Sequence, residues 1–244
     1  MKFTELDSRM RVFETASDLC VLPGIYMVAR IDGRHFHTLT KEGGKFEAPF
    51  DEKFRDLMTG TVKHLMKNSG FNFVYGYTES DEISLLFNFE SQDFGRKLRK
   101  LNSILAGEAS AKFSLLYGDI GVFDCRISQL PNKSDVVDYF RWRNEDAFRN
   151  ALNAWCYWTL RKEGQSKKDA STVIEGLSVS EKNELLFQHG INFNDLPLWQ
   201  KRGIGFYWES YEKDGGERRR LKIDMELPMG DAYGEFIFGM LQNL

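Results

Sequence analysis

The apolar residues of the first half of the chain follow two periodicities, and together they predict six elements. Short β-branched and aromatic runs bounded by Gly, Pro or Asp are typical of buried strands, whereas apolar residues three and four positions apart predict helices. The predicted order is strand, helix, strand, strand, helix, strand, over residues 24–31, 51–69, 71–77, 83–89, 98–118 and 122–127. This is the β-α-β-β-α-β order of a ferredoxin-like α+β domain. In that topology the end of the first strand lies beside the central hairpin.

The second half is predicted to add helices and another hairpin. Residues 134–163 indicate one long helix or a broken pair, and Ser178 with Glu181 forms a capping-box start to a short helix. Residues 204–225 contain two strand-like runs separated by Lys-Asp-Gly-Gly, which predicts a hairpin. We expect one continuous body with two parts, a core over residues 1–132 and a helical extension with a C-terminal hairpin over residues 133–244.

Composition narrows the classes of protein that fit. Apolar residues make up 42% and charged residues 28% of the 244 positions, which is typical of a globular domain. The net charge of −3 argues against a uniform electrostatic grip on nucleic acid. The three cysteines, Cys20, Cys125 and Cys156, form no CxxC pair, and neither an apolar leader nor an 18-residue apolar stretch occurs. We therefore expect a cytoplasmic protein without a zinc site, a disulfide framework or a membrane span.

Two carboxylate-bearing segments carry most of the predicted chemistry. Asp32 follows the first buried strand and precedes Gly33, and Asp81 lies between the two strands of the central hairpin. Carboxylates at neighbouring strand ends can hold hard cations without being buried unpaired. Two Mg²⁺ ions held there would serve phosphoryl or nucleotidyl transfer. Asp32 with Gly33 would equally fit a turn, and an isolated aspartate at position 81 is more often structural than catalytic. Their pairing on one domain favours the metal site.

Basic and aromatic residues add weaker indications. Arg34, His35 and His37 could line a triphosphate pocket, although a structural role is the alternative for each histidine. Four basic runs hint at a polyanionic partner, at residues 96–100, 161–162, 167–168 and 218–220. The following aromatic residues are expected in the core rather than on a base-stacking surface: Trp142, Trp155, Tyr157, Trp158, Trp199 and Trp208. The absence of HExxH, GxxxxGK[ST] and GxGxxG argues against zinc-hydrolase, P-loop and Rossmann chemistry.

Taken together, these motifs resemble those of the tRNA(His) guanylyltransferase family, including its guanylyltransferase-like members. The matching segments follow the family's order over most of the chain and are highly specific in combination. They are residues 30–37, 75–82, 123–126, 139–143, 182–187 and 190–194.

The resemblance implies a fold like the palm of ordinary polymerases and nucleotide addition in the reverse, 3′-to-5′ direction. In the family, ATP or GTP first activates the 5′-monophosphate of a tRNA, and the 3′-hydroxyl of an incoming nucleotide then attacks that phosphate. Two Mg²⁺ ions are expected on Asp32, Asp81 and the backbone carbonyl of Gly33, with Glu82 as a further catalytic carboxylate.

The resemblance also implies the binding residues and the assembly. The nucleotide is expected against Asp32, Gly33, Arg34, His35, Phe36, His37, Ser80 and Asp81. Further phosphate or tRNA contacts are expected at Lys45, Arg126, Asn150, Lys182 and Asn192. A homo-oligomer, a tetramer by resemblance, is expected as the assembled form.

Two departures from the family pattern bear on the substrate. Members that add guanosine to tRNA(His) carry His-Ile-Asn-Asn-Leu-Tyr-Asn in the long helix, whereas residues 148–154 here retain only Asn150 and Leu152 of it. A family lysine of the first loop is Ala48 here, with Lys45 close by in sequence. The first departure favours a guanylyltransferase-like protein that repairs truncated tRNA 5′ ends against a template.

Two alternatives come from other classes of protein. A nucleotide cyclase-like palm enzyme would use the same two carboxylates without RNA. A non-catalytic RNA-recognition module would need exposed aromatic residues in a K/R-G-F/Y pattern, which is absent, and has no use for paired carboxylates. A 3′-to-5′ nucleotidyltransferase accounts for both the carboxylates and the motifs.

Overall fold

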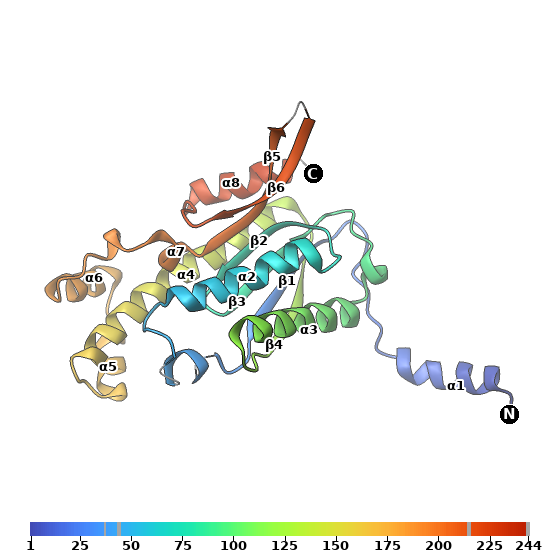
Figure 1. The fold of residues 1–244 in the computed structure, drawn as a ribbon, viewed down its shortest axis with the longest axis horizontal. Coiled ribbons are helices and arrows are strands. Elements are labelled where there is room, and N and C mark those ends of the chain that lie inside the picture. Colours follow the sequence, from blue (N-terminus) through green and yellow to red (C-terminus); the bar gives the residue numbers. More distant parts are fainter. Residues whose placement is uncertain (37, 43–44, 214–215, 243–244) are drawn as a thin grey trace.

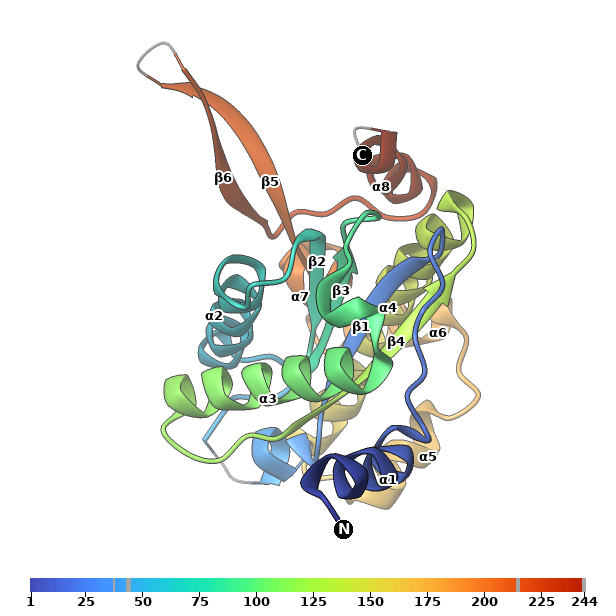
Figure 2. The ribbon, with the colours of Figure 1, turned by 90° about the vertical axis from the view of Figure 1, so that its right-hand side faces the viewer.

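The fold is built on one six-stranded antiparallel sheet with helices on both faces (Figures 1 and 2). The structure is a computed structural model that describes residues 1–36, 38–42, 45–213 and 216–242. The strands are β1 (Tyr26–Gly33), β2 (Phe73–Glu79), β3 (Glu82–Phe87), β4 (Phe123–Leu130), β5 (Ile204–Lys213) and β6 (Gly216–Asp224).

Helices of very different length surround the sheet. The α-helices are α1 (Phe3–Thr15), α2 (Glu52–Asn68), α3 (Leu98–Tyr117), α4 (Lys133–Lys162), α5 (Lys167–Ile174), α6 (Val179–Gln188), α7 (Leu198–Arg202) and α8 (Asp231–Gln242). Three short helical turns are η1 (Thr38–Glu42), η2 (Asp93–Arg96) and η3 (Phe193–Asp195). Within the described ranges, no helix combines the length and the apolar content needed to cross a bilayer.

The strand order confirms the predicted ferredoxin-like topology. The sheet runs β4-β1-β3-β2-β5-β6, so the first four strands have the antiparallel 4-1-3-2 order that two β-α-β units produce. The predicted C-terminal hairpin is also present, and its strand β5 pairs with β2. The hairpin therefore extends the same sheet, and strands from both halves of the chain are hydrogen-bonded to one another.

Local sequence explains where the core elements begin and end. The Asp51 carboxylate caps α2, because it accepts hydrogen bonds from the backbone amides of Lys53 and Phe54 at 2.7 and 3.1 Å. Gly118 ends α3 with a left-handed φ of 77°, a conformation that glycine adopts without strain. The first strand runs on to Gly33, past its predicted end at residue 31, because Asp32 stays paired with both β3 and β4 and Gly33 stays paired with β4.

Apolar side chains fill both faces of the sheet. Alternate residues of β1 point to opposite faces: Met27, Ala29 and Ile31 pack with α2 and α3, whereas Tyr26 and Val28 pack with α4 and α8. A third cluster joins the C-terminal half of α4 to α6 and η3. The long α4 is one uninterrupted helix, which settles the choice between one helix and a broken pair.

Several features differ from the sequence-based expectations. The helices α1, α5, α7 and α8 were not predicted, and α8 completes the core by burying Tyr233, Ile237 and Leu241. The expectation that Trp142 lies in the core is wrong, since 53% of this residue is exposed. Its ring lies at the surface of α4 with the guanidinium group of Arg143 over it, 4.6 Å from the centroid.

Candidate active site

Asp32 lies one residue before the end of β1, the strand that runs between β4 and β3. Its direct partners across the sheet are Glu82 on β3 and Asp124 on β4. Because directly paired residues present their side chains on the same face, the three carboxylates form a row across three strands. The side chain of Asp32 is 30% exposed, so its carboxylate remains accessible to a ligand.

Asp81 is brought next to the end of β1 by the β2–β3 hairpin. Glu79 pairs with Glu82, which leaves Ser80 and Asp81 as a two-residue turn. The backbone N–H of Gly33 donates a hydrogen bond of 3.1 Å to the carbonyl oxygen of Asp81. The predicted proximity of the first strand end and the hairpin turn is thereby confirmed.

Gly33 is held in a space that admits no side chain. A Cβ atom at this position would lie 2.6 Å from two atoms of the Phe36 ring and 2.9 Å from the Cβ atom of Asp81. Phe36 is 2% exposed and its ring packs against Phe54, Phe113 and Phe123, so it cannot move aside. The close approach of β1 to the turn thus requires glycine.

Gly33→Ala is expected to lower both the free energy of unfolding and the activity. The added methyl group forces β1 away from the Asp81 turn, and overpacking of this kind costs about 1–3 kcal/mol. Thermal unfolding and single-turnover rates measure the two effects. Gly107→Ala is the matched control, because a Cβ atom there meets nothing within 4 Å and the residue is exposed on α3. An unchanged Gly33→Ala variant would contradict this geometry.

A cleft of about 560 Å³ opens beside the carboxylates. Asp32, Ser80, Asp81 and Glu82 line it, together with parts of three other segments. These are the connection into α2 (residues 46–51), the middle of α4 (residues 143–158) and Trp199 with Gln200 of α7. The cleft therefore combines carboxylates with aromatic and polar walls, which suits a nucleotide.

Arg143 of α4 ties together the two residues that flank the Asp81 turn. Its guanidinium group lies 3.0 Å from the carboxylate of Glu79 and 2.7 Å from that of Glu82, and it also reaches Asp146 at 3.2 Å. Only 3% of the Arg143 side chain is exposed. Burial, with the nearby charge of Glu82, raises the pKa of Glu79 to about 8, and burial also raises the pKa of Glu82. Arg143 therefore compensates carboxylates that the interior would otherwise disfavour.

Two further arginines flank Asp32. Arg30, two residues earlier on the same face of β1, lies 3.4 Å from the Asp32 carboxylate and pairs closely with Glu82. Arg126 on β4 lies 3.5 Å from Asp32, and its side chain is 59% exposed. Sequence reasoning did not single out Arg30 or Arg143. The two-residue spacing of Arg30 from Asp32 could have indicated a shared face, whereas nothing local signals the contacts of Arg143.

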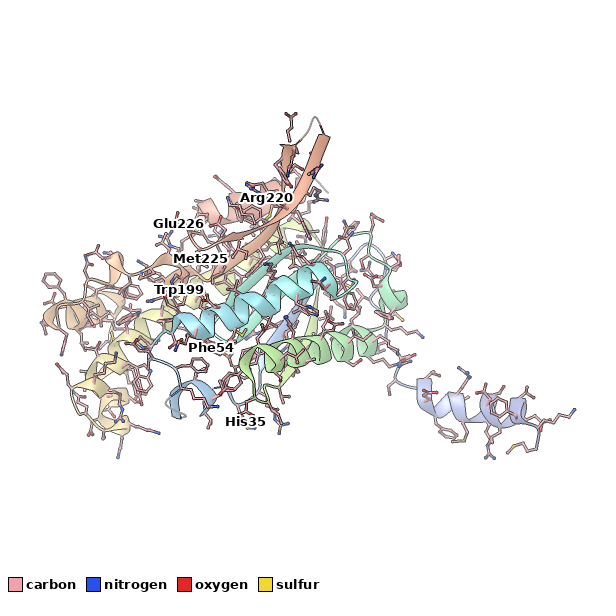
Figure 3. All side chains as sticks on the ribbon, viewed as in Figure 1. His35, Phe54, Trp199, Arg220, Met225 and Glu226 are labelled. Atoms are coloured by element: carbon pink, nitrogen blue, oxygen red, sulfur yellow. The ribbon has the colours of Figure 1, made fainter. Side chains whose placement is uncertain are left out.

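The loop after β1 separates the predicted nucleotide-binding residues. Arg34 and His35 are exposed and do not line the cleft, and Figure 3 shows His35 at the lower margin of the molecule. The Phe36 side chain belongs to the core, so only its backbone can contact a ligand. His37 lies outside the described residues. Of the residues expected at the nucleotide, Asp32, Ser80 and Asp81 line the cleft, with Gly33 directly behind Asp81.

The other predicted contacts divide in the same way. Asn150 lines the cleft, and Arg126 lies beside Asp32. Lys45 pairs instead with Asp119 at 3.5 Å and lies over the ring of Tyr117, whereas Ala48 lines the cleft. Lys45 therefore does not take the place of the family lysine.

Two expected contacts lie in a different part of the molecule. Lys182 is on α6 and does not line the cleft. The Asn192 side chain accepts a hydrogen bond from the amide of Asn194 and donates one to Asp195, so it caps η3. The structure does not bring either residue to the carboxylates.

The donor atoms at the strand ends fit magnesium. In the part of the chain that the structure describes, no three His, Cys, Asp or Glu side chains form a cluster that could hold a metal by themselves. Mg²⁺ usually takes only one or two carboxylates from the protein and completes its shell with water and substrate phosphates. Asp32 and Asp81 on adjacent elements, with the backbone oxygen atoms of this strand end, match that requirement.

A 4-1-3-2 antiparallel sheet with carboxylates at the end of β1 and in the β2–β3 turn defines a palm-like nucleotide-handling enzyme. The family model described as "tRNAHis guanylyltransferase" matches residues 7–131, and the "Thg1 C terminal domain" matches residues 134–227. The chain belongs to the tRNA(His) guanylyltransferase family.

Relatives and solved structures agree with this assignment. A probable tRNA(His) guanylyltransferase of Mus musculus is 29% identical over 228 residues, covering 89% of this chain and 75% of the mouse protein. A Drosophila melanogaster counterpart is 32% identical over 76% of this chain and 68% of its own length. Among solved structures, a bacterial tRNA(His) guanylyltransferase (Thg1)-like protein in complex with ATP superposes with a TM-score of 0.76 at 30% identity, covering 96% of this chain and 98% of that one. The Saccharomyces cerevisiae tRNA(His) guanylyltransferase superposes with a TM-score of 0.73 at 27% identity, covering 86% and 95%.

Proposed function

We propose that this protein is a Mg²⁺-dependent nucleotidyltransferase that adds nucleotides to the 5′ end of tRNA in the 3′-to-5′ direction. The observation that carries the proposal is the hydrogen bond between Gly33 and Asp81, which sets Asp32 and Asp81 side by side at the cleft. Relatives named for guanylate transfer to tRNA(His) support the reaction class. Related bacterial proteins solved with ATP and with GTP support both nucleotides as substrates.

The residues around the cleft are assigned different roles in the reaction. Asp32, Asp81 and the Gly33 carbonyl would hold two Mg²⁺ ions. These ions would neutralise the negative charge of the phosphate while the 3′-hydroxyl attacks phosphorus and the leaving group departs. Arg126, exposed beside Asp32, is placed to bind a phosphate of the tRNA 5′ end or of the nucleotide. Arg30 and Arg143 stay paired with the buried Glu82, so we assign Glu82 to positioning these arginines.

The cleft wall on α4 favours repair of truncated tRNAs over a dedicated tRNA(His) reaction. Ala151 and Ala154 line the cleft at positions where tRNA(His)-adding members carry asparagine. Phe148 packs edge-on against Phe193 in the position of the family histidine, with their ring centroids 5.4 Å apart. Three polar groups of the family motif are thus replaced by apolar ones. We infer that the template base, rather than the anticodon, selects the added nucleotide.

We expect the protein to extend several 5′-truncated tRNAs, each with the nucleotide that pairs with the opposing base of the acceptor stem. The experiment uses two labelled substrates, a truncated tRNA with a non-histidine anticodon and full-length tRNA(His), each with ATP and the four nucleotides. Changing the opposing base should change the added nucleotide. Strong activity on full-length tRNA(His) with none on the truncated tRNA would contradict the repair function.

The same assay separates the alternative classes. A nucleotide cyclase-like enzyme would consume nucleotide without tRNA, and an RNA-binding module would leave both substrates unextended. Template-dependent extension of the labelled tRNA is the result that supports the proposed reaction.

The projecting hairpin offers a second contact for tRNA. β5 pairs with β2 only from Ile204 to Tyr207, while the pairing with β6 continues to Lys213, so the rest of the hairpin stands out from the sheet (Figure 2). Exposed arginines follow one another on β6 at residues 218–220, and Figure 3 shows Arg220 on this arm. Contacts of this kind bind the phosphate backbone without reading sequence.

We also propose that the protein acts as a homo-oligomer.

A further inference from the structure

Helix α1 stands apart from the rest of the molecule (Figure 1). None of its residues from Phe3 to Thr15 is buried. The chain is anchored only after the helix: the carboxylate of Asp18 pairs with Arg99 and Lys97, and the carbonyl oxygen of Leu19 accepts a hydrogen bond of 2.9 Å from the amide of Leu98. The tether is therefore fixed to the start of α3, while the rest of the described chain buries none of the residues of the helix.

The apolar residues of α1 form a single seam. Phe3, Leu6, Met10 and Phe13 follow the 3-4-3 spacing of the a and d positions of a coiled coil. They are exposed by 79%, 39%, 50% and 73%. A 13-residue helix is marginal in water on its own, and burial of such a seam is what stabilises a helix of this length. The seam therefore requires a partner.

The charges beside the seam identify the partner. In this heptad frame Arg9 occupies a g position and Glu14 an e position. Asp7, the other e residue, pairs within the helix with Arg11 at 2.8 Å. Two parallel copies place each g residue against the e residue five positions later in the other copy, which pairs Arg9 of each copy with Glu14 of the other. Antiparallel copies would instead oppose like charges. We propose that α1 pairs in parallel with α1 of a second copy of this chain, as a two-stranded coiled coil.

Other occupants fit the charge pattern less well. A membrane-surface helix typically carries a basic polar face, whereas α1 (residues 3–15) carries Glu5, Asp7 and Glu14 against Arg9 and Arg11. Self-pairing uses both signs of charge at once. It also orders the helix at the moment of association, so helix formation and assembly are coupled. The inference is independent of the proposed reaction.

Disulfide trapping in the full-length protein tests the pairing and its direction. The exposed native Cys20 is replaced by serine, and single cysteines are introduced as Leu6→Cys and Met10→Cys. In a parallel pair each introduced cysteine faces its own copy, so each variant alone should form a covalent dimer under mild oxidation. Val12→Cys is the matched control, because Val12 is 65% exposed but lies off the seam.

Each outcome decides the proposal. Covalent dimers of Leu6→Cys and Met10→Cys that form at least about tenfold faster than those of Val12→Cys support it, since seam positions are held in contact. Cross-linking only when Leu6→Cys and Met10→Cys are mixed would show an antiparallel pair and overturn it. Rates equal to the control would also overturn it. Adding lipid vesicles should leave the rates unchanged, and loss of cross-linking with vesicles would identify a membrane partner instead.

A charge swap gives an independent check by sedimentation. Arg9→Glu sets two acidic residues against each other and should weaken self-association on the order of tenfold, whereas the double variant Arg9→Glu with Glu14→Arg should restore it. The double variant keeps the composition of α1 and serves as the folding control. Equal association of all three proteins would contradict the e–g pairing.

Discussion

Asp32→Asn and Asp81→Asn are each expected to abolish nucleotide addition while leaving the fold intact. Each change removes a negative oxygen from the strand-end site and with it charge stabilisation worth several kcal/mol, which corresponds to a loss of rate on the order of 10³-fold or more. The ion pairs of Asp32 with Arg30 and Arg126 are 3.4 and 3.5 Å long, so their loss should change the free energy of unfolding by less than about 1 kcal/mol. Single-turnover extension of a labelled truncated tRNA and thermal unfolding measure the two quantities.

Asp124→Asn is the control for these variants. Asp124 pairs with Asp32 across the sheet, but its side chain is 68% exposed and it does not line the cleft. We expect its rate to remain within about twofold of the unchanged protein, since an exposed carboxylate outside the site adds little. Near-normal activity of either Asp32→Asn or Asp81→Asn would refute the assignment of the metal ligands.

Arg143→Met is expected to cause the largest loss of stability. The guanidinium group compensates the carboxylates of Glu79 and Glu82, whose side chains are only 12% and 8% exposed. Removing one member of a buried ion pair leaves uncompensated charge and costs about 3–5 kcal/mol. For a chain of this size that corresponds to a fall in Tm of roughly 6–20 °C. Because both glutamates flank the Asp81 turn, activity should fall with stability.

The loss of stability caused by Arg143→Met should grow as the pH rises. Without the arginine, the folded-state pKa values of Glu79 and Glu82 rise further above their unfolded values of about 4.3. A carboxyl group with a raised folded-state pKa stabilises the fold while it is protonated, and this contribution is lost as the pH rises through the folded-state pKa. The pKa of Glu79 is already about 8. The free energy of unfolding of the variant should therefore differ less from that of the unchanged protein at about pH 5 than at about pH 8.

Arg141→Met is the matched control on the same helix. The Arg141 side chain is 34% exposed, and its guanidinium group lies 3.1 Å from the carboxylate of Asp231. The side chain of Asp231 is 92% exposed. A surface pair of this kind contributes less than about 1 kcal/mol. A destabilisation of Arg141→Met equal to that of Arg143→Met would show that burial of the charges is not the cause.

Periodicity predicted the elements that bury one clear face. The α2 and α3 helices, the four core strands and the capping box of α6 all follow from local spacing and caps. The helices that were missed have local patterns that are weak or ambiguous. In α8, Gly234 and Gly239 lower the helix propensity, and only packing against α4 fixes the helix. In α1 the apolar seam faces solvent, so nothing within one chain gives it a role.

Only the part of the candidate site that follows directly from the topology could be predicted from the sequence. Asp32 and Asp81 follow from strand ends that one topology sets together. The burial of Phe36 and the pairing of Lys45 with Asp119 depend on how a loop folds back on α3, which no local pattern encodes. The position of Arg143 is equally remote from its partners in sequence, since a helix that begins at Lys133 supplies it to a turn at residue 80.

The two family segments contribute strands to one sheet, so neither is a complete structural unit by itself. β2 belongs to the first segment and β5 to the second, and they share a ladder from Thr78–Ile204 to Tyr75–Tyr207. A chain that lost the second segment would leave β2 as an open edge, and the buried hydroxyl of Tyr77 would lose the carbonyl oxygen of Arg202 in α7 that accepts its hydrogen bond. Each segment alone therefore leaves unpaired backbone groups at the β2–β5 boundary, and the two segments form one structural unit.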